Sequence, residues 1–329
     1  MSNKKIFLGY QTKQFISLFE LIDPTFLESY DPIITTSEGL CTEEEQIEAL
    51  KTCEVFVGFN PVRTRHLENA PNLKLVSAMT MGLDKIDIEE CSKRGVYVAN
   101  SPFHGIESTS DHAITLILAA NKQIYKSMKY IHDGKWLKPN FQICVGNDLR
   151  QQTVGMVGFG RIGKRVADKL HHGWGMNVLY HCRSDKNLEN YEYVADLNEL
   201  FSRCKIISVN LPYTKHTHHY IDKEQFDKIK LDRFGMGMIF VNTSRGPIVN
   251  ESALVEALNE KKVRVAGLDV FENEPKIHPD LMSNENCILT SHIGGQTMES
   301  WFKMAKSIVD NVKSFYENGK PVHAVNELD

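Results

Sequence analysis

Residues 152–170, QTVGMVGFGRIGKRVADKL, decide the fold of this chain. A short apolar run leads into a glycine-rich turn, and a helical pattern follows it. This order is typical of a dinucleotide-binding unit, whose three glycines permit a tight turn, close approach of a pyrophosphate and close packing of helix on strand. Because G-x-G-x-x-G also occurs in purely structural turns, the flanking strand and helix are what favour nucleotide binding here. We therefore expect dinucleotide contacts from Gly158, Gly160, Arg161, Ile162 and Gly163.

The overall composition is ordinary for a globular protein. The 329 residues are enough for two domains, with 42% hydrophobic and 24% charged residues. A net charge of −4 leaves no basic surplus to neutralise phosphates, so we expect no nucleic acid partner. No apolar run approaches the roughly 20 residues that span a bilayer, so we expect no membrane association. The charged start, MSNKKIFLGY, lacks the apolar core of a signal peptide, so a cytoplasmic location is expected.

Cysteines and histidines form no pattern typical of a metal site. The seven cysteines are scattered without a C-x-x-C pair, which indicates reduced thiols rather than disulfides or zinc ligands. The runs His171-His172 and His216-x-His218-His219 have no Cys or acidic cluster to complete a ligand set. We expect solvated histidines there and no metal.

Short β-rich runs alternate with helical patterns along the whole chain. Such alternation, with continuously apolar strands, predicts parallel sheets that are covered by helices on both faces. The expected fold class is α/β, with two doubly wound parallel-sheet domains: a flavodoxin-like substrate domain and a Rossmann nucleotide domain. We expect strands at 4–10, 54–59, 73–78, 96–100, 176–182, 205–211, 237–243, 264–270 and 286–291. We expect helices near 11–22, 43–51, 85–93, 161–172, 197–203, 222–229 and 251–260.

Two long helical patterns mark the places where the chain passes between domains. One covers about 107–130 and follows Pro102, and the other covers about 297–316 and follows the glycines of 292–295. Proline disfavours helix just before it and glycine permits unusual backbone angles, so both breaks suit hinges. We therefore expect an NAD(P)-binding domain at 103–291, inserted into a substrate-binding domain that consists of 1–102 and 292–329.

The strand after the glycine turn should end at the ribose of the adenosine. NAD sites usually carry an acidic residue there, about 20 residues after the first glycine, to hold the 2′-hydroxyl. This region reads Tyr180-His181-Cys182-Arg183-Ser184, and the first acid is Asp185. A guanidinium can hold a 2′-phosphate with paired hydrogen bonds. Arg183, helped by Ser184, therefore favours NADP, whereas NAD serves equally well if Arg183 is only a solvated loop residue.

Three later segments place polar side chains directly after apolar runs: VNTSRGPIVN (241–250), VAGLDVFENEP (265–275) and SHIGGQT (291–297). The carboxyl ends of parallel strands meet at the sheet edge where ligands bind. Together the segments supply Arg245, Glu274 and His292. At these residues the chain strongly resembles the D-isomer-specific 2-hydroxyacid dehydrogenase family, and within it the glyoxylate/hydroxypyruvate or general 2-ketoacid reductases.

The resemblance implies catalytic roles for these three residues. Arg245 would bind the substrate carboxylate and polarise the 2-keto oxygen, and His292 would be the acid/base at that oxygen. Glu274 would hydrogen-bond His292 and favour its imidazolium form. Taken singly, each residue could instead serve in a surface ion pair, a loop or a core contact, but the three together favour catalysis.

The resemblance also extends to binding positions. The loop VSAMTMGLDKID (76–87) is similar to the family's carboxylate cradle, where backbone N–H groups hold the substrate, although a plain turn is the alternative. In many relatives a histidine occupies the position of Asn210, so a side-chain role there is in doubt. The residues implied in substrate binding are Thr80, Met81, Gly82, Arg245 and His292. Those implied in cofactor binding beyond the glycine turn are Thr109, Arg183, Ser184, Pro212, Thr217, Thr243 and Asp269.

The sequence as a whole predicts an NAD(P)H-dependent reductase that converts small 2-keto acids into D-2-hydroxy acids. A nucleotide-sensing, corepressor-like binding protein of the same fold is the alternative. The resemblance also implies a homodimer, with an interface along 107–150. Its apolar side chains, which could instead pack within the chain, are Trp136, Leu137, Phe141 and Ile143.

Overall fold

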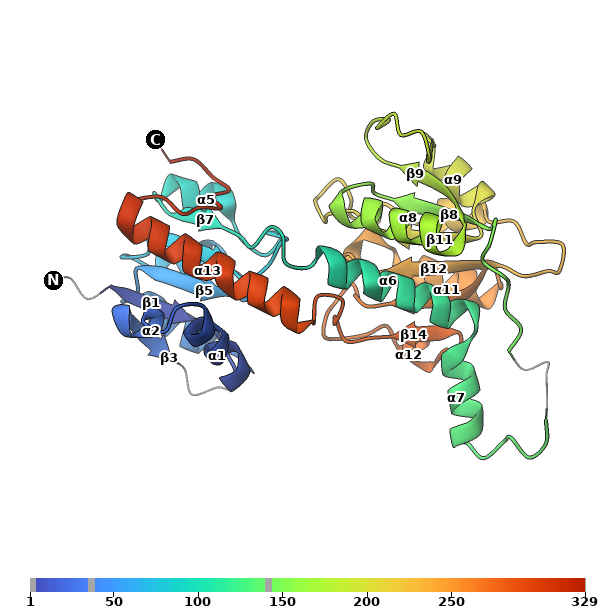
Figure 1. The fold of residues 1–329 in the computed structure, drawn as a ribbon, viewed down its shortest axis with the longest axis horizontal. Helices are drawn as coiled ribbons and strands as arrows, with labels where there is room; N and C mark the ends of the chain where they lie inside the picture. The colour runs from blue at the N-terminus through green and yellow to red at the C-terminus, as the bar shows by residue number, and fades with distance from the viewer. Residues whose placement is uncertain (1–3, 35–38, 140–143, 329) are drawn as a thin grey trace. The chain divides into compact units, whose positions relative to one another are not determined.

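The computed structural model describes residues 4–34, 39–139 and 144–328. The chain forms two compact units, one of Met1–Gly105 with Gln296–Asp329 and the other of Ile106–Gly295 (Figure 1). The second unit is therefore inserted into the first. Each unit is built around a parallel sheet of its own.

The first unit contains a five-stranded parallel sheet with the order β3-β1-β5-β6-β7. Numbered within the unit, this order is 2-1-3-4-5, which is the flavodoxin-like order and confirms the predicted fold class. A separate antiparallel pair joins β2 (Tyr10–Gln11) to β4 (Gly39–Leu40). The strands of the main sheet are β1 (Lys5–Leu8), β3 (Asp31–Ile34), β5 (Val55–Gly58), β6 (Leu75–Ala78) and β7 (Tyr97–Ala99).

Helices cover both faces of this sheet. The longest helix of the unit, α13 (Met298–Asn318), packs on α1 and β6. Its residues Met304, Ile308 and Val312 recur every four positions and are fully buried in the core, as expected for the inward stripe of an amphipathic helix. The other helices are α1 (Lys13–Ile22), α2 (Phe26–Ser29), α3 (Glu43–Leu50), α4 (Thr64–Glu68) and α5 (Ile88–Lys93).

The second unit contains a seven-stranded parallel sheet with the order β10-β9-β8-β11-β12-β13-β14. Numbered within the unit, this is 3-2-1-4-5-6-7, the Rossmann order extended by one strand, as predicted. The strands are β8 (Thr153–Val157), β9 (Asn177–His181), β10 (Glu192–Tyr193), β11 (Ile206–Val209), β12 (Met238–Asn242), β13 (Val263–Leu268) and β14 (Cys287–Leu289).

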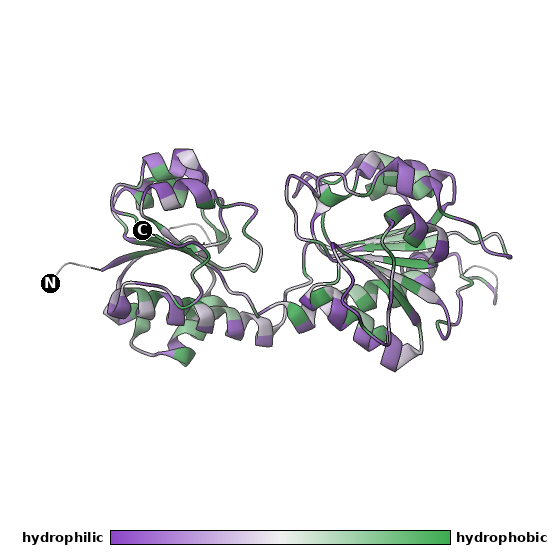
Figure 2. Cartoon of the chain, turned by 90° about the horizontal axis from the view of Figure 1, so that it is seen from above, coloured by the Kyte–Doolittle hydropathy of each residue, from purple (hydrophilic) through white to green (hydrophobic). Residues whose placement is uncertain are grey.

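The helices of the second unit lie on both faces of its sheet, and hydrophobic residues are concentrated along the strands between them (Figure 2). They are α6 (Ile106–Asn121), α7 (Ile124–His132), α8 (Arg161–Trp174), α9 (Leu197–Arg203), α10 (Lys223–Asp227), α11 (Glu251–Asn259) and α12 (Pro279–Ser283), with a 3-10 turn at Gly246–Ile248. None of the described helices combines the length and the apolar character needed to cross a bilayer.

The prediction of one continuous helix over 107–130 is wrong. The helix α6 ends at Asn121, and Gln123 has a left-handed backbone with φ of 50° before α7 begins. The Asn121 side chain donates to the Asn147 carbonyl (2.7 Å), and the Gln123 amide donates to the Val145 carbonyl (3.1 Å). The break is therefore fixed by a segment that returns more than 20 residues later, and the local pattern contains no signal of it.

Candidate active site

The glycine turn lies at the carboxyl end of β8. Gly158 has φ of 94°, and a Cβ atom on Gly163 would lie 2.3 Å from the Gly158 carbonyl oxygen, so turn and helix meet too closely for a side chain. A Cβ atom on Gly160, the N-cap of α8, would meet no described atom within 4 Å. Arg161 is exposed in the first helical turn, and Ile162 packs against the core. The turn thus leaves open space at the positive end of α8, where a pyrophosphate fits.

Three buried side-chain oxygens of the second unit have no hydrogen-bond partner within the described residues. They are Ser108 Oγ in α6, Asn210 Oδ1 after β11 and Thr243 Oγ1 after β12. The Asn210 amide nitrogen donates to the Ser208 carbonyl (2.9 Å). This hydrogen bond fixes the side chain, while Asn210 Oδ1 accepts no hydrogen bond from the described residues. Buried polar atoms are normally paired, so unpaired ones call for a ligand or water. Together with the open turn, these residues fit a nicotinamide dinucleotide.

The other predicted cofactor residues occupy different surroundings. Arg183 and Ser184 are exposed in the loop after β9. Thr217 closes its own loop, because its hydroxyl donates to the Pro212 carbonyl at 2.9 Å. Thr109 is buried within α6. Their contacts with a cofactor stay predictions.

His292 and Glu274 form a hydrogen-bonded pair beyond the ends of β14 and β13. The His292 Nδ1 lies 2.9 Å from the Glu274 Oε2, and the two side chains are 47% and 29% exposed. The other carboxylate oxygen of Glu274 accepts the backbone N–H of Phe271 at 3.1 Å, which orients the carboxylate. Because a carboxylate accepts at Nδ1, that nitrogen carries a hydrogen, and Nε2 is the atom left to meet a substrate.

Arg245 lies beyond the end of β12, next to the segment that carries Glu274. Its Nη1 donates to the Ser244 carbonyl at 2.8 Å. A Cβ atom on Gly246 would lie 1.9 Å from the backbone of Phe271, so the two segments touch where only glycine fits. Since β12, β13 and β14 are neighbours, the three predicted catalytic residues follow adjacent strands at one edge of the sheet.

Asp269 anchors the turn that carries His292. Its carboxylate is only 1% exposed and accepts hydrogen bonds from the Thr290 hydroxyl (2.6 Å) and from the Ile293 and Gly294 backbone N–H groups (both 2.8 Å). Burial alone raises the pKa of this carboxyl, but its hydrogen bonds outweigh burial and hold the pKa below the usual value. The predicted contact of Asp269 with a cofactor stays a prediction, whereas its hydrogen bonds hold the turn of His292 in place.

The backbone of His292 has an unfavourable conformation that these hydrogen bonds stabilise. Its backbone is left-handed, with φ of 57°, a conformation that costs a non-glycine residue roughly 1–2 kcal/mol. Its N–H donates to the Asp269 carbonyl at 3.0 Å. From α6, His112 Nε2 lies 3.0 Å from Thr290 Oγ1 and 3.3 Å from Asp269 Oδ1. Sequence reasoning missed His112 and Thr290; a polar residue on the inward side of an apolar helix was the available signal.

A second histidine–carboxylate contact supports the loop of Glu274. His219 Nε2 contacts the Glu272 carboxylate, and the Glu272 N–H donates to the Glu251 carboxylate at 2.9 Å. Glu251 is 5% exposed, and burial, with smaller effects of the neighbouring acids, raises its pKa. The prediction of a solvated loop is thus refined at His219, whose side chain is 35% exposed but pairs with Glu272. Within the described parts of the chain, no group of His, Cys, Asp or Glu side chains is arranged to hold a metal ion.

The predicted carboxylate cradle is a loop of the first unit. The Thr80 hydroxyl donates to the Gly82 carbonyl at 2.5 Å, and the Asn100 amide donates to the Met81 carbonyl at 2.9 Å. Both hydrogen bonds stabilise the loop by using the carbonyl groups of Met81 and Gly82 as acceptors. The Met81 and Gly82 N–H groups have no acceptor among residues 4–34, 39–139 and 144–328, so an anion could bind them.

Helix α7 and the segment after it carry an exposed apolar surface. No residue of α7 is buried, and Ile124, Met128 and Ile131, which share one face, are about half exposed. Trp136 and Leu137 follow, with 58% and 89% of their surface exposed. Figure 1 shows α7 extending away from the sheet of its unit. The two other predicted interface residues, Phe141 and Ile143, lie outside the described residues.

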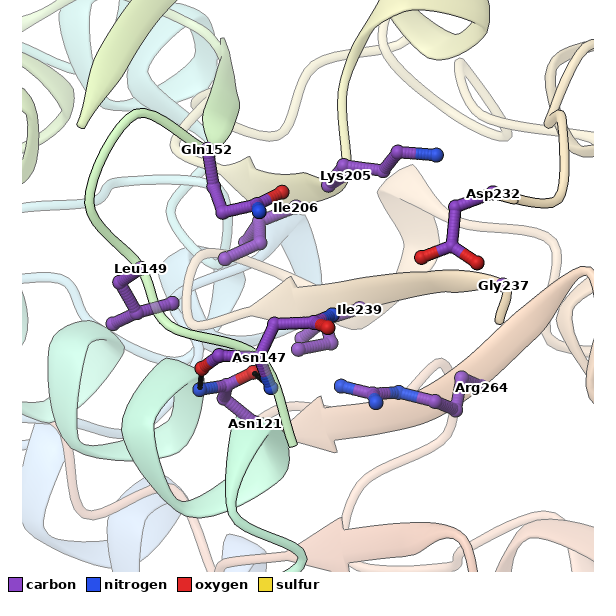
Figure 3. Close-up of a pocket in the computed structure, with 10 residues that line it drawn as sticks. All are labelled: Asn121, Asn147, Leu149, Gln152, Lys205, Ile206, Asp232, Gly237, Ile239 and Arg264. Atoms are coloured by element: carbon purple, nitrogen blue, oxygen red, sulfur yellow. Dashed lines mark hydrogen bonds between the residues drawn. The ribbon is translucent and has the colours of Figure 1, made fainter. Parts of the chain in front are cut away.

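A small hollow lies at the opposite, amino-terminal edge of the same sheet (Figure 3). The Arg264 guanidinium extends into it and lies 3.4 Å from the Val145 carbonyl. Because His292 and the glycine turn lie at the carboxyl edge, this hollow is separate from the candidate active site. It is lined by Asn121, Asn147, Leu149, Gln152, Lys205, Ile206, Asp232, Gly237, Ile239 and Arg264.

Comparison with known proteins agrees with this geometry. Residues 114–294 match the family model of the D-isomer specific 2-hydroxyacid dehydrogenase, NAD binding domain. A glyoxylate reductase of Korarchaeum cryptofilum is 37% identical over 290 residues, which are 85% of each chain. A glyoxylate reductase of Pyrococcus furiosus is 33% identical over 309 residues, 91% of this chain and 90% of the relative.

The solved structures that resemble this chain have the same architecture over nearly its full length. The crystal structure of a glyoxylate reductase from Paecilomyes thermophila superposes with a TM-score of 0.83 and 27% identity, covering 99% of both chains. Both the sequence and the arrangement of strands are thus shared. The chain belongs to the D-isomer specific 2-hydroxyacid dehydrogenase family.

Proposed function

We propose that this protein is an NAD(P)H-dependent oxidoreductase that reduces small 2-keto acids of the glyoxylate or hydroxypyruvate kind to D-2-hydroxy acids. The observation that carries the proposal is the His292–Glu274 pair, which follows β13 and β14 at the edge where Arg245 also lies. The relatives named above are glyoxylate reductases, and none of them is a corepressor.

In the proposed reaction, one residue of the site donates the proton and another stabilises the negative charge that develops on the oxygen. A bound nicotinamide supplies the hydride that reduces the carbonyl carbon. His292 donates a proton from Nε2 to the keto oxygen, so that ketone, hydride and proton together give the alcohol. Glu274 accepts a hydrogen bond from Nδ1, which orients the imidazole ring so that Nε2 faces the substrate. Arg245 binds the substrate carboxylate and stabilises the charge that develops on the oxygen.

We propose NADP as the preferred cofactor, with NAD as a weaker one. Arg183 and Ser184 are exposed in the loop after β9, where the adenosine ribose of a Rossmann-bound cofactor lies. Guanidinium groups favour a 2′-phosphate, whereas the NAD-specific acid is absent from these two positions. Contacts with the cofactor are assigned to the glycine turn, Thr109, Pro212, Thr217, Thr243 and Asp269. In the first unit, Thr80, Met81 and Gly82 are assigned to the substrate carboxylate.

We also propose a homodimer. The exposed apolar residues of α7, with Trp136 and Leu137 after it, form a continuous surface rather than scattered single residues, and a second copy of the chain would bury it.

We propose a cytoplasmic location as well. All seven cysteines are free thiols, which suits a reducing compartment.

The test is a panel of 2-keto acids, including glyoxylate, hydroxypyruvate and branched and aromatic acids, with NADH and NADPH in parallel. We expect oxidation of the cofactor with the small acids and a D-configured product by chiral chromatography. His292→Ala should retain cofactor binding and lose most of the reduction. Absence of cofactor oxidation with every acid, or equal activity of His292→Ala, would overturn the assignment.

A further inference from the structure

The loop after β9 contains two carboxylates, Asp185 and Glu189, and the structure ties the one next to Arg183 and Ser184, Asp185, to a buried ring. The Tyr180 hydroxyl donates to Asp185 Oδ1 at 2.5 Å, and the Asn187 backbone N–H donates to the same oxygen at 2.8 Å. The Tyr180 oxygen in turn accepts the Lys186 N–H at 2.9 Å. One phenol therefore fixes both the acid and the backbone that follows it.

Tyr180 is fixed in the core of the second unit, so its hydroxyl group is a stationary attachment point for the loop. Its ring is fully buried and stacks on Phe159, the residue between the first two glycines of the turn, with ring centroids 4.2 Å apart. Burial and the hydrogen bond to Asp185 raise the pKa of Tyr180 to about 12, so the phenol stays a donor near neutral pH. The same bond lowers the pKa of the Asp185 carboxyl, which therefore stays charged and bound.

The two residues before Asp185 are exposed like Asp185 itself, but they are not tied to the core. Within the described residues the Arg183 guanidinium has no carboxylate partner. The loop thus offers a cation and a hydroxyl to solvent, while the carboxylate that directly follows them, Asp185, is held by Tyr180. A free carboxylate beside Arg183 would either pair with it or repel a phosphate bound there.

We propose that the Tyr180–Asp185 hydrogen bond is a cofactor-specificity element, which holds the carboxylate away from the 2′ position of the adenosine ribose. Without it, Asp185 would compete for Arg183, repel a 2′-phosphate and accept a hydrogen bond from a 2′-hydroxyl. The bond therefore favours NADP over NAD. This inference rests on the proposed function only in taking the ligand to be a nicotinamide dinucleotide.

The experiment uses the full-length protein and measures kcat/KM for NADPH and for NADH with glyoxylate. Tyr180→Phe keeps the ring stacked on Phe159 and removes only the hydroxyl. We expect the NADPH-to-NADH ratio to fall roughly tenfold, mainly through KM for NADPH, as one unit charge is released near the phosphate. Adding Asp185→Asn to Tyr180→Phe should restore most of the ratio, because the released side chain is then neutral.

A matched control is available in the same unit. The Tyr191 hydroxyl donates to Asp168 Oδ1 at 2.6 Å, so Tyr191→Phe also removes a phenol–aspartate bond, but one between the loop and α8. It should leave the cofactor ratio unchanged. If Tyr180→Phe does not fold, Asp185→Glu leaves the buried ring intact and displaces the carboxylate, and it too should lower the ratio.

The outcomes separate this inference from the proposed function. Equal losses with both cofactors in Tyr180→Phe, or a lowered ratio that Asp185→Asn does not restore, would show that the bond is only structural and overturn the inference. If the wild type reduces none of the acids, the proposed function fails instead. Titration of the same variants with NADP and NAD then still measures the binding ratio, and an unchanged ratio would refute the inference.

Discussion

Replacing Asp269 by asparagine tests whether the buried carboxylate holds the turn of His292. The carboxylate accepts the Gly294 N–H at Oδ2 and the Thr290 hydroxyl and Ile293 N–H at Oδ1. An amide keeps an acceptor at only one of these positions, so the buried Gly294 N–H faces a donor, which costs about 1–3 kcal/mol. The bonds that remain lose their charge assistance, at about 1 kcal/mol in total. Relief from burying a charge offsets part of this, so we expect a net loss of about 2 kcal/mol.

The assay is urea unfolding followed by circular dichroism, together with steady-state kinetics of keto acid reduction. We expect the free energy of unfolding to fall by about 2 kcal/mol. We expect kcat to fall at least about tenfold, because the left-handed His292 backbone relaxes once its anchor weakens. Thr290→Val removes one of the bonds and should lose about 1 kcal/mol. Asp280→Asn, at an exposed position of α12, is the control and should change neither quantity appreciably.

The pH dependence gives a second check on the same residue. The folded pKa of the Asp269 carboxyl is lowered, so the stability that the carboxylate contributes is fully present above its unfolded pKa, near 3.9, and is lost as pH falls through the folded value. The difference between wild type and Asp269→Asn should therefore narrow below about pH 4. A variant as stable and as active as the wild type at neutral pH would refute the reasoning.

Three further predictions address other parts of the molecule. Glu274→Gln should lower kcat for reduction roughly a hundredfold in steady-state kinetics, because His292 loses the carboxylate that orients its ring. Gly163→Ala should destabilise the protein by about 2 kcal/mol or more, since its methyl group would lie 2.3 Å from a carbonyl oxygen, whereas Gly173→Ala, with open space, should stabilise α8 by roughly 0.5–1 kcal/mol in thermal unfolding. Met128→Glu should convert the proposed dimer to monomer in sedimentation, and an unchanged mass would contradict the α7 interface.

Much of the fold could be predicted, because the apolar runs are uninterrupted. The run MIFVN of β12 is short, rich in β-branched and aromatic residues and buried at every position, as expected for a central strand of a covered sheet. The two-residue strand β10 could not be predicted, since its pattern is too short to have a period. The break between α6 and α7 was also hidden, because it depends on side-chain bonds to residues 145–147.

The residues of the candidate site could be predicted only where a charged or titratable side chain directly follows an apolar strand. Arg245, Glu274 and His292 are polar residues after apolar strands, and their positions at one sheet edge followed from the strand order. The supporting network could not be read in the same way. The Asp269 bonds cross more than 20 residues to Thr290, Ile293 and Gly294, and no local spacing encodes such contacts. A charged residue that the structure buries completely is recognised only after its neighbours are placed.

The interrupted first unit has a consequence for biosynthesis. On the ribosome, the second unit is complete in the nascent chain before α13 has been made, and it can close while the first unit still lacks its longest helix. Until then, the apolar side chains that α13 covers on α1 and β6 face water or a chaperone. A released chain that ends at residue 295 should therefore contain a protease-resistant second unit joined to a protease-sensitive first one.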